Sequence, residues 1–246
     1  MGVLADVFGL DADLALPLFT GDPMYERERN WGLFVGGRIV SCLTTRPLEF
    51  GWGRAVGIAG VSTIEEARSE GYAARLIERV LRESERAGEG PALLFCVDDR
   101  LYGRLGFEPL DRVVTARVRS NGHAIPMEEP SLAEVRARYD AWALRSPERL
   151  RRDERRWTYW AWKYRQILSL GPAGEGGYAS LENDVVREVL APDLEAGLPV
   201  PEGTEAFALT YVIDKLDLPF EPLAVQMYLM GRGVPGLVQM FLTDQF

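Results

Sequence analysis

The residues from 60 to 73 have the types and spacing most suited to chemistry. They read GVSTIEEARSEGYA, in which an apolar stretch is followed by Arg68, Gly71 and Ala73 just where a helical pattern starts. The first turn of a helix has unpaired N–H groups and a partial positive charge, both of which attract anions. Gly71 has no Cβ, so the backbone can approach a ligand closely. The pattern predicts a cradle for a diphosphate, although an ordinary strand-to-helix turn has the same appearance.

Other catalytic side chains are scarce. Among the 246 residues there is one histidine, His123, and the two cysteines, Cys42 and Cys96, are far apart. These counts exclude a zinc site built on several histidines, a cysteine-rich metal site and a disulfide framework. A Ser-His-Asp triad could use only His123. We therefore expect no metal, and chemistry that depends on carboxylates, hydroxyls, tyrosines or a bound cofactor.

The elements expected around the turn alternate between strand and helix. Residues 72–88 place apolar side chains on one face and charged ones on the other, and Gly88 ends this amphipathic helix. The other expected elements are a β-hairpin over 31–43 that turns at Gly36 and Gly37, strands over 53–64, 91–97 and 112–118, and a short helix over 101–105. This alternation predicts an α/β domain over residues 1–118.

The second half of the chain predicts another α/β unit. Residues 119–130, with Gly122, Pro126 and Pro130, are typical of a linker. Beyond it we expect helices over 131–142 and 147–164, strands over 177–190, 223–232 and 237–242, and a helix or strand over 204–213. The second domain is therefore expected over residues 131–246.

Residues 57–110 resemble the core of the GNAT superfamily, the acyl-CoA-dependent N-acyltransferases. Two motifs carry the resemblance: the turn with Arg68, Gly71 and Ala73, and the phrase YGRLGF at residues 102–107. The resemblance implies a GNAT fold, a mixed twisted sheet flanked by helices, with acetyl-CoA as cosubstrate. It implies that the turn holds the CoA pyrophosphate and that the preceding strand pairs with the pantetheine arm. The residues implied to bind acetyl-CoA are Val61, Ser62, Thr63, Arg68, Ser69, Gly71, Tyr72 and Ala73.

The same resemblance implies a catalytic role for Tyr102, which it places near the thioester sulfur. A phenol has a reference pKa of about 10, so Tyr102 keeps its proton at neutral pH. It can hydrogen-bond to the departing thiolate, whose thiol has a reference pKa of about 8.5, and give that proton to it. The alternative is a structural tyrosine that packs beneath the acetyl-CoA site.

A looser resemblance, over residues 1–190, is to the Eis group of tandem-GNAT N-acetyltransferases. It is carried by Phe8-Gly9, by the YGRLGF phrase and by the segment 147–160 with Arg151, Arg152, Asp153, Glu154 and Trp157. It implies a first GNAT domain, a second, reduced GNAT-like α/β domain, and an aminoglycoside- or polyamine-like acceptor. The second half has no R-x-x-G-x-A turn, so we expect one acyl-CoA site per chain.

The acceptor amine must lose a proton before it attacks, and several acids could take that proton. Glu26 and Glu28 precede the first strand, and Asp98 and Asp99 lie beside Tyr102 in the sequence. The Eis resemblance adds the terminal carboxylate of Phe246. The alternatives are solvated surface acids and a frayed chain end.

The chain is acidic, with a formal net charge of −9. This charge argues against a general nucleic-acid binder and suits a cationic substrate, although it also serves solubility. Glu65, Glu66 and Glu70 flank the predicted polyanion site and weaken it unless their side chains point to solvent. We expect no membrane span and no signal peptide, because no long apolar run and no basic leader is found, and the unpaired cysteines favour the cytoplasm.

The predicted function is therefore acetyl transfer from acetyl-CoA to a primary amine of a small cationic molecule. Two alternatives stay open at this point. One is acetylation of protein lysines or N-termini, which needs an open groove for a peptide. The other is a non-catalytic acyl-CoA-binding or interaction module. The sequence also leaves a homo-oligomer open.

Overall fold

The computed structural model describes residues 11–118, 120, 122, 130–163, 166–170, 176–190, 198–215 and 224–246. The chain divides into two compact units. The first runs to Glu108 and adds Met230–Gly236 and Phe246, and the second comprises Pro109–Leu229 and Leu237–Gln245. The domain limits of 1–118 and 131–246 stay a prediction, since most of the expected linker, with His123, lies outside the described residues, as does Phe8-Gly9.

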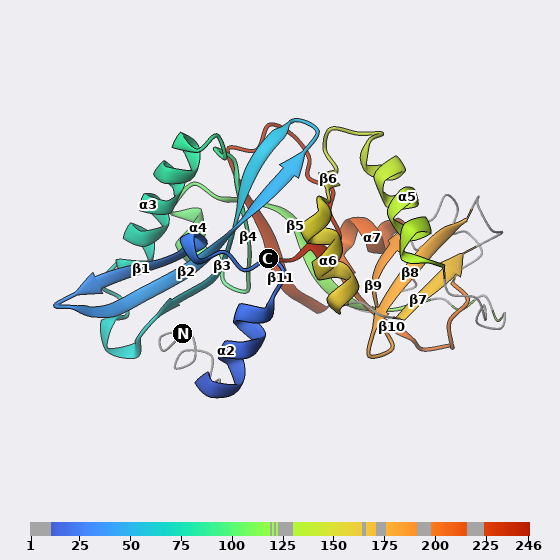
Figure 1. Cartoon of the computed structure of the whole chain (residues 1–246), viewed down its shortest axis with the longest axis horizontal. Coiled ribbons are helices and arrows are strands. Elements are labelled where there is room, and N and C mark those ends of the chain that lie inside the picture. The colour runs from blue at the N-terminus through green and yellow to red at the C-terminus, as the bar shows by residue number, and fades with distance from the viewer. Residues whose placement is uncertain are drawn as a thin grey trace. The chain divides into compact units, whose positions relative to one another are not determined.

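The first unit has a mixed sheet whose strands follow the order β1-β2-β3-β4 (Figure 1). After α2 (Ala12–Gly21) and the 3-10 turn η1 (Arg27–Arg29), the strands β1 (Asn30–Val35), β2 (Arg38–Phe50) and β3 (Gly53–Thr63) are antiparallel neighbours. β4 (Ala92–Cys96) runs parallel to β3. The predicted hairpin is confirmed, because β1 and β2 join at Gly36 and Gly37, whose φ angles of 57° and 81° suit glycine.

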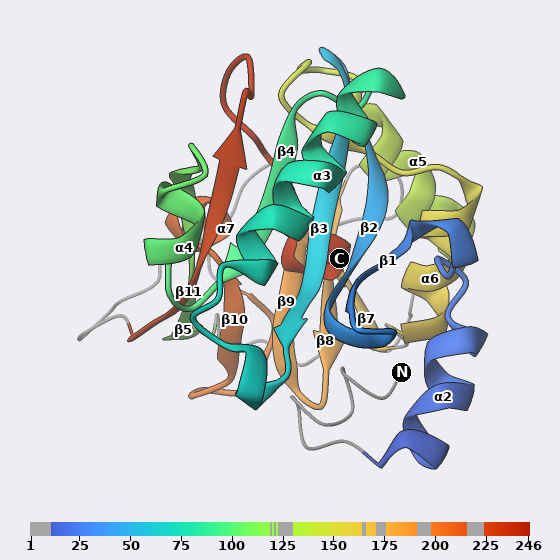
Figure 2. The same cartoon turned by 90° about the vertical axis from the view of Figure 1, so that its left-hand side faces the viewer.

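The helix α3 (Tyr72–Arg86) packs on this sheet as its amphipathic pattern predicts. Its apolar residues Leu76, Ile77, Val80 and Leu81 are buried. The helix contacts β1, β2 and β3, and Figure 2 shows it lying across β3. The turn η2 (Glu65–Ala67) precedes α3, and α4 (Arg100–Gly103) follows β4. The predicted anion-binding turn and the YGRLGF phrase therefore follow the carboxyl ends of two neighbouring parallel strands, a common place for ligand sites.

The second unit is also α/β. Its strands follow the order β5-β10-β9-β8-β7, and all neighbours in this order are antiparallel except β9 and β10, which are parallel. The strands are β5 (Glu108–Arg117), β6 (Leu150–Arg151), β7 (Gln166–Leu170), β8 (Gly177–Glu182), β9 (Val185–Leu190), β10 (Glu205–Leu209) and β11 (Ala224–Arg232). Both β5 and β11 have residues in each of the two units. The helical elements are α5 (Leu132–Ala143), α6 (Glu154–Lys163), α7 (Thr210–Lys215) and η3 (Leu242–Asp244).

The helix expected over 147–164 starts later than predicted. It begins at Glu154, because the Asp153 carboxylate accepts a hydrogen bond from the Arg156 N–H at 2.8 Å, as an N-cap residue does. Leu150 and Arg151 belong instead to β6, and the Leu150 N–H donates to the Gln239 carbonyl at 3.0 Å.

Other expectations for the second half are refined or overturned. Residues 177–190 form two strands, since Asn183 and Asp184 have φ angles of 51° and 63° and make a tight hairpin turn. The segment 204–213 holds both alternatives, with β10 followed by α7. The strand expected over 237–242 is wrong: within that segment only Gln239 forms an isolated bridge, to Arg149, and η3 begins at Leu242.

A buried ionic network lies within the second unit. The side chains of Arg152 and Glu188 are both 0% exposed, and Arg152 Nη2 lies 2.8 Å from Glu188 Oε2. Arg152 Nε donates to Asp244 Oδ1 at 2.7 Å, and the guanidinium lies 3.8 Å from the centre of the Tyr139 ring. Glu188 also accepts hydrogen bonds from Trp160, Tyr178 and Thr243. Buried charges that are this fully paired hold η3 to the strand β9 and to Arg152.

Two features are absent from the described part of the chain. No helix there is long and apolar enough to cross a bilayer. In the same residues, no three His, Cys, Asp or Glu side chains are grouped so that they could hold a metal ion.

Candidate functional site

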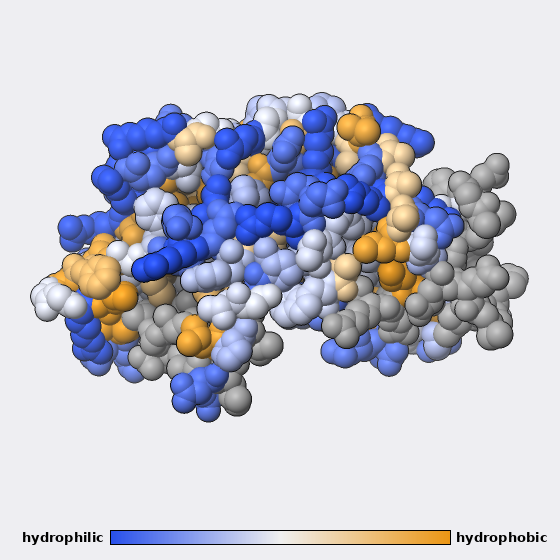
Figure 3. Space-filling view, in the orientation of Figure 1, coloured by the Kyte–Doolittle hydropathy of each residue, from blue (hydrophilic) through white to orange (hydrophobic). Residues whose placement is uncertain are grey.

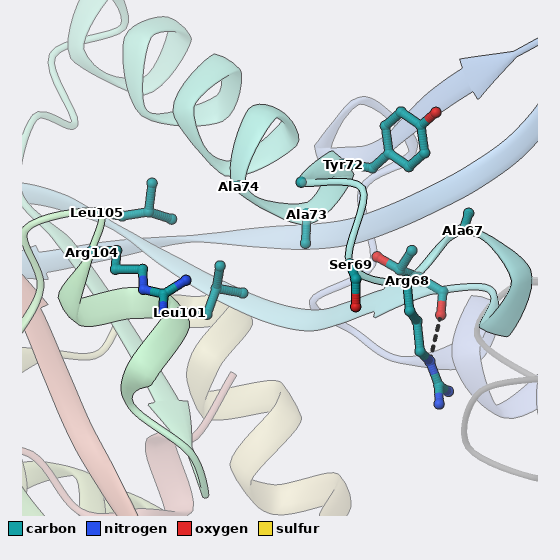
Figure 4. Close-up of a pocket in the computed structure, with 11 residues that line it drawn as sticks. Ala67, Arg68, Ser69, Tyr72, Ala73, Ala74, Leu101, Arg104 and Leu105 are labelled. Carbon is teal, nitrogen blue, oxygen red and sulfur yellow. Dashed lines mark hydrogen bonds between the residues drawn. The ribbon is translucent and has the colours of Figure 1, made fainter.

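A pocket of about 390 Å³ opens where β3 ends and α3 begins (Figure 4). Of the residues predicted to bind a diphosphate-containing cofactor, it brings together Thr63, Arg68, Ser69, Gly71, Tyr72 and Ala73. Ala67, Ala74, Leu101, Arg104 and Leu105 complete the lining. Val61 and Ser62, one or two residues earlier on β3, do not line it.

The backbone of the turn is built to present the start of α3. Gly71 is the N-cap, with φ at 76°, and Ser69 has φ at 67°, so two residues of this turn are left-handed. No side chain caps the helix, and its first turn carries no acidic residue. A Cβ added at Gly71 would meet no protein atom within 4 Å, so the space above it is open. Exposed N–H groups at the start of a helix of 15 residues form an anion site.

Tyr72 supports the turn from behind. In Figure 4 its ring points away from the pocket, on the side opposite to Ser69 and Ala73. The ring packs with Leu33 against Val40, Ile64 and Ala67. The helix start is therefore held by apolar packing, and Tyr72 takes part through its backbone and position more than through its hydroxyl.

The charges around the pocket favour an anion. Arg68 donates from Nε to the Thr63 carbonyl at 3.4 Å, and Arg104 lies on the α4 side. Glu65, Glu66 and Glu70 are exposed and none of them lines the pocket. Glu66 instead lies 3.8 Å from Arg38. These three acids could either weaken the anion site or point to solvent. In the structure they face solvent, where water and salt screen them.

The strand β3 is irregular just before the pocket. Thr44 pairs with Ala59 and Cys42 with Ser62, so Gly60 and Val61 together face one residue of β2, and Gly60 has φ at 59°. This is the arrangement of a β-bulge, which interrupts the ladder and turns backbone groups away from the neighbouring strand. The Ser62 hydroxyl donates to the Gly60 carbonyl at 3.0 Å and stabilises the bulge.

Tyr102 lies on α4 and is half-buried. Burial, followed by the charges of Cys96 and Asp98, raises the pKa of Tyr102 to about 12. Its ring packs edge-on against Phe107, with the ring centres 6.1 Å apart. The phenol is therefore neutral throughout the physiological range and is able to donate a proton. It does not line the anion pocket itself, whereas Leu101, Arg104 and Leu105 do.

The predicted acids differ in their partners. Asp98 is exposed and accepts from Arg100 Nε at 2.9 Å; this hydrogen bond lowers the pKa of Asp98 to about 2. Glu26 Oε2 lies 3.0 Å from Arg29 Nε, and Glu28 is exposed on η1. A carboxyl held by a guanidinium is a weak base, so Asp98 is poorly suited to take a proton from an amine.

Phe246 packs on the strands that lead to the pocket. Its ring centre lies 5.5 Å from that of Phe95 on β4. A Cβ at Gly57 on β3 would lie only 2.7 Å from two carbons of the Phe246 ring. Gly57 is therefore a seat for this ring, and neither Gly57 nor Phe95 was singled out by sequence.

Gly57→Ala should displace the Phe246 ring and lower the free energy of unfolding by about 1–3 kcal/mol, because the new Cβ would lie only 2.7 Å from ring carbons. In a Phe246→Ala background, where the ring is absent, the same change should cost much less. The matched control is Gly32→Ala, whose Cβ would meet no atom closer than 3.5 Å. Urea unfolding of the double-mutant cycle measures the coupling, and additive effects would argue against the seat.

The residues Leu101, Arg104 and Leu105 were not predicted as part of the site. They belong to α4 and the residues directly after it, and they are three and four positions apart. Residues at this spacing share one face of a helix, so the pattern was present in the sequence. What sequence could not tell was that this face lies opposite the turn at Arg68.

Comparisons with known proteins find likeness in sequence over residues 3–110 and in fold over most of the chain. Residues 3–110 match the family described as "Acetyltransferase (GNAT) domain". No curated protein sequence matches the chain significantly. Among solved structures, a GCN5-related N-acetyltransferase from Anabaena variabilis is similar over 94% of this chain and 68% of that chain, with 19% identity and a TM-score of 0.69.

Two further structures are similar over most of this chain. A GCN5-related N-acetyltransferase from Kribbella flavida matches 93% of this chain and 67% of its own, with 17% identity and a TM-score of 0.69. Eis1 from Mycobacterium abscessus matches 94% of this chain and 69% of its own, with 17% identity and a TM-score of 0.59. At these identities the likeness shows the fold, and the expected α/β fold class is confirmed.

Proposed function

Residues 3–110 of this chain are a GNAT acetyltransferase domain, and on that premise we propose that the protein transfers an acetyl group from acetyl-CoA to a primary amine of a small cationic molecule. The observation that carries the proposal is the pocket that joins Arg68, Gly71 and the uncapped start of α3. A diphosphate fits this pocket because N–H groups, helix charge and guanidinium all favour an anion.

In the proposed reaction the chain supplies positioning and one proton. The pyrophosphate of acetyl-CoA binds at residues 68–73, and the pantetheine arm pairs with β3 at Val61 and Thr63. A backbone N–H of this segment polarises the thioester carbonyl, in the manner of an oxyanion hole. The amine nitrogen bonds to the acetyl carbon, the C–S bond breaks, and Tyr102 gives its proton to the departing thiolate.

The proton of the attacking amine needs its own acceptor. Phe246 is one candidate position for such an acceptor, because the Phe246 ring contacts Gly57 and Phe95 on the two strands that end at the pocket. Glu26 and Glu28 remain candidates for attracting a cationic acceptor. Asp98 is a poor base, because Arg100 lowers its pKa to about 2.

The finer features of the proposal are the acceptor class, the tandem arrangement and the compartment. A net charge of −9 favours a cationic acceptor such as an aminoglycoside- or polyamine-like amine. We place the protein in the cytoplasm, with a second, reduced GNAT-like domain after the first. A panel of amines, scored by release of free thiol from acetyl-CoA, tests the acceptor class; binding without thiol release from any amine would favour the non-catalytic alternative.

Gly71→Ala is expected to weaken acetyl-CoA binding at least about tenfold, because the new Cβ projects into open space where the diphosphate must approach. Thermal shift with acetyl-CoA measures it: ligand at about 100 times Kd stabilises by about 2.7 kcal/mol, and a tenfold loss of affinity removes about half of that. The matched control is Gly88→Ala, at a glycine that also has φ at 76° and no neighbour within 4 Å. Equal losses in both variants, or no stabilisation of the unmodified protein, would overturn the proposal.

A further inference from the structure

The pocket at the start of α3 has a second cation that enters from a different element. Arg104 follows α4 and lines the pocket together with Leu101 and Leu105. Figure 4 shows its side chain on the α4 side, with Arg68, Ser69 and Ala73 on the other side. We propose that Arg104 binds the diphosphate of acetyl-CoA and closes the anion site from the side opposite to the helix start. The inference rests on the proposed function.

The two arginines of the pocket are not equivalent. Arg68 already donates through Nε to the Thr63 carbonyl, so part of its guanidinium is committed to holding the turn. Arg104 is exposed and, within the described part of the chain, makes no hydrogen bond and no ion pair. A free guanidinium beside an open anion pocket keeps all its donors for a ligand, and its planar fork matches two phosphate oxygens.

The surrounding charges show why a second cation is needed. Glu65 and Glu66 on η2 and Glu70 in the turn lie close in sequence to Arg68, and the three carboxylates outnumber that single guanidinium. They face solvent, where water and salt weaken their repulsion of a polyanion without abolishing it. Arg104 approaches from the other side of the pocket and partly offsets their repulsion of a polyanion.

Arg100 on the same helix provides the contrast. Its guanidinium is taken up by Asp98, from which Nε lies 2.9 Å, and it does not line the pocket. Arg100→Ala and Arg104→Ala each remove one positive charge from the same short segment. A general effect of charge would therefore appear in both variants, and a specific phosphate contact only in Arg104→Ala.

The test measures Kd for CoA and for 3′-dephospho-CoA by calorimetry in the full chain. Arg104→Ala is expected to weaken both ligands by about 10-fold or more, because a hydrogen bond to a charged group is lost. Arg104→Lys should recover part of the loss, since charge returns without the fork. Arg100→Ala should change Kd by less than about 2-fold.

Each other result counts against the proposal. A loss for CoA that disappears with 3′-dephospho-CoA would assign Arg104 to the 3′-phosphate and overturn the diphosphate contact. Equal losses in Arg100→Ala and Arg104→Ala would reduce the effect to overall charge. If the unmodified chain binds neither CoA nor 3′-dephospho-CoA, the proposed acetyl-CoA function fails, and the role of Arg104 fails with it. This outcome differs from a failure of the Arg104 proposal alone, in which the unmodified chain binds both ligands and Arg104→Ala binds them equally well.

Discussion

Tyr102→Phe is expected to lower kcat by about 10²–10⁴-fold, the largest change in activity that we expect from one atom. The proposed proton for the CoA thiolate comes from this hydroxyl, and burial raises the pKa of Tyr102 to about 12, so the phenol holds its proton at every pH at which the protein is assayed. Phenylalanine keeps the ring and its edge-on contact with Phe107, so the fold and the acetyl-CoA Kd should be unchanged.

The measurement is thiol release in steady state, with the acetyl-CoA Kd from calorimetry beside it. Tyr228→Phe is the matched control, because Tyr228 is also half-buried and belongs to neither the pocket nor α4. An unchanged kcat in Tyr102→Phe would return Tyr102 to the structural role that the sequence left open. The pH profile adds a second check: kcat should show no alkaline fall due to Tyr102 below pH about 11, since its pKa is raised to about 12.

The first unit was predictable from sequence because its patterns are local. The apolar face of α3, the Gly36-Gly37 turn and the short apolar run of β4 each need only their own residues to be recognised. The same is true of the turn at Arg68, whose glycine must have positive φ. Local propensity and tertiary structure agree there, which is the usual condition for a correct prediction.

The second unit was harder because burial decides its structure. Residues 151–156, RRDERR, have the charge pattern of an exposed helix, and the prediction included them in a helix over 147–164. Arg152 and Arg156 are in fact buried, and Asp153 ends the extended segment by capping α6. Burial is possible because Arg152 pairs with Glu188 and Asp244. Both partners lie far away in sequence, so no local pattern indicates them.

The candidate site also has a part that local sequence patterns predict and a part that depends on tertiary contacts. Arg68, Ser69, Gly71, Tyr72 and Ala73 were predicted as parts of one local motif, and all five line one pocket in the structure. Arg104 needed the packing of α4 near the turn, and the seat of Phe246 on Gly57 needed a contact between the end of the chain and a strand near its start. Tertiary contacts of this kind have no spacing rule that a single sequence could reveal.

Arg152→Met is expected to lower the free energy of unfolding by about 3–5 kcal/mol, the largest change in stability that we expect. Methionine has a similar length but no charge, so Glu188, 0% exposed, and Asp244, 3% exposed, lose their main cation without gaining access to water. The contact of the guanidinium with the Tyr139 ring, 3.8 Å from its centre, is lost as well. Urea denaturation followed by tryptophan fluorescence measures the change, since Trp157 and Trp160 lie beside this guanidinium.

The matched control is Arg136→Met, which breaks an ion pair of the same kind at the surface. Arg136 and Glu154 are 40% and 76% exposed, so water replaces the lost partner, and the free energy of unfolding should change by no more than about 1 kcal/mol. If Arg152→Met unfolds the protein completely, Glu188→Gln, which keeps shape and hydrogen bonding, should give a folded variant of intermediate stability. A loss below about 1 kcal/mol in Arg152→Met would mean that the buried network stabilises the second unit no more than a surface pair does.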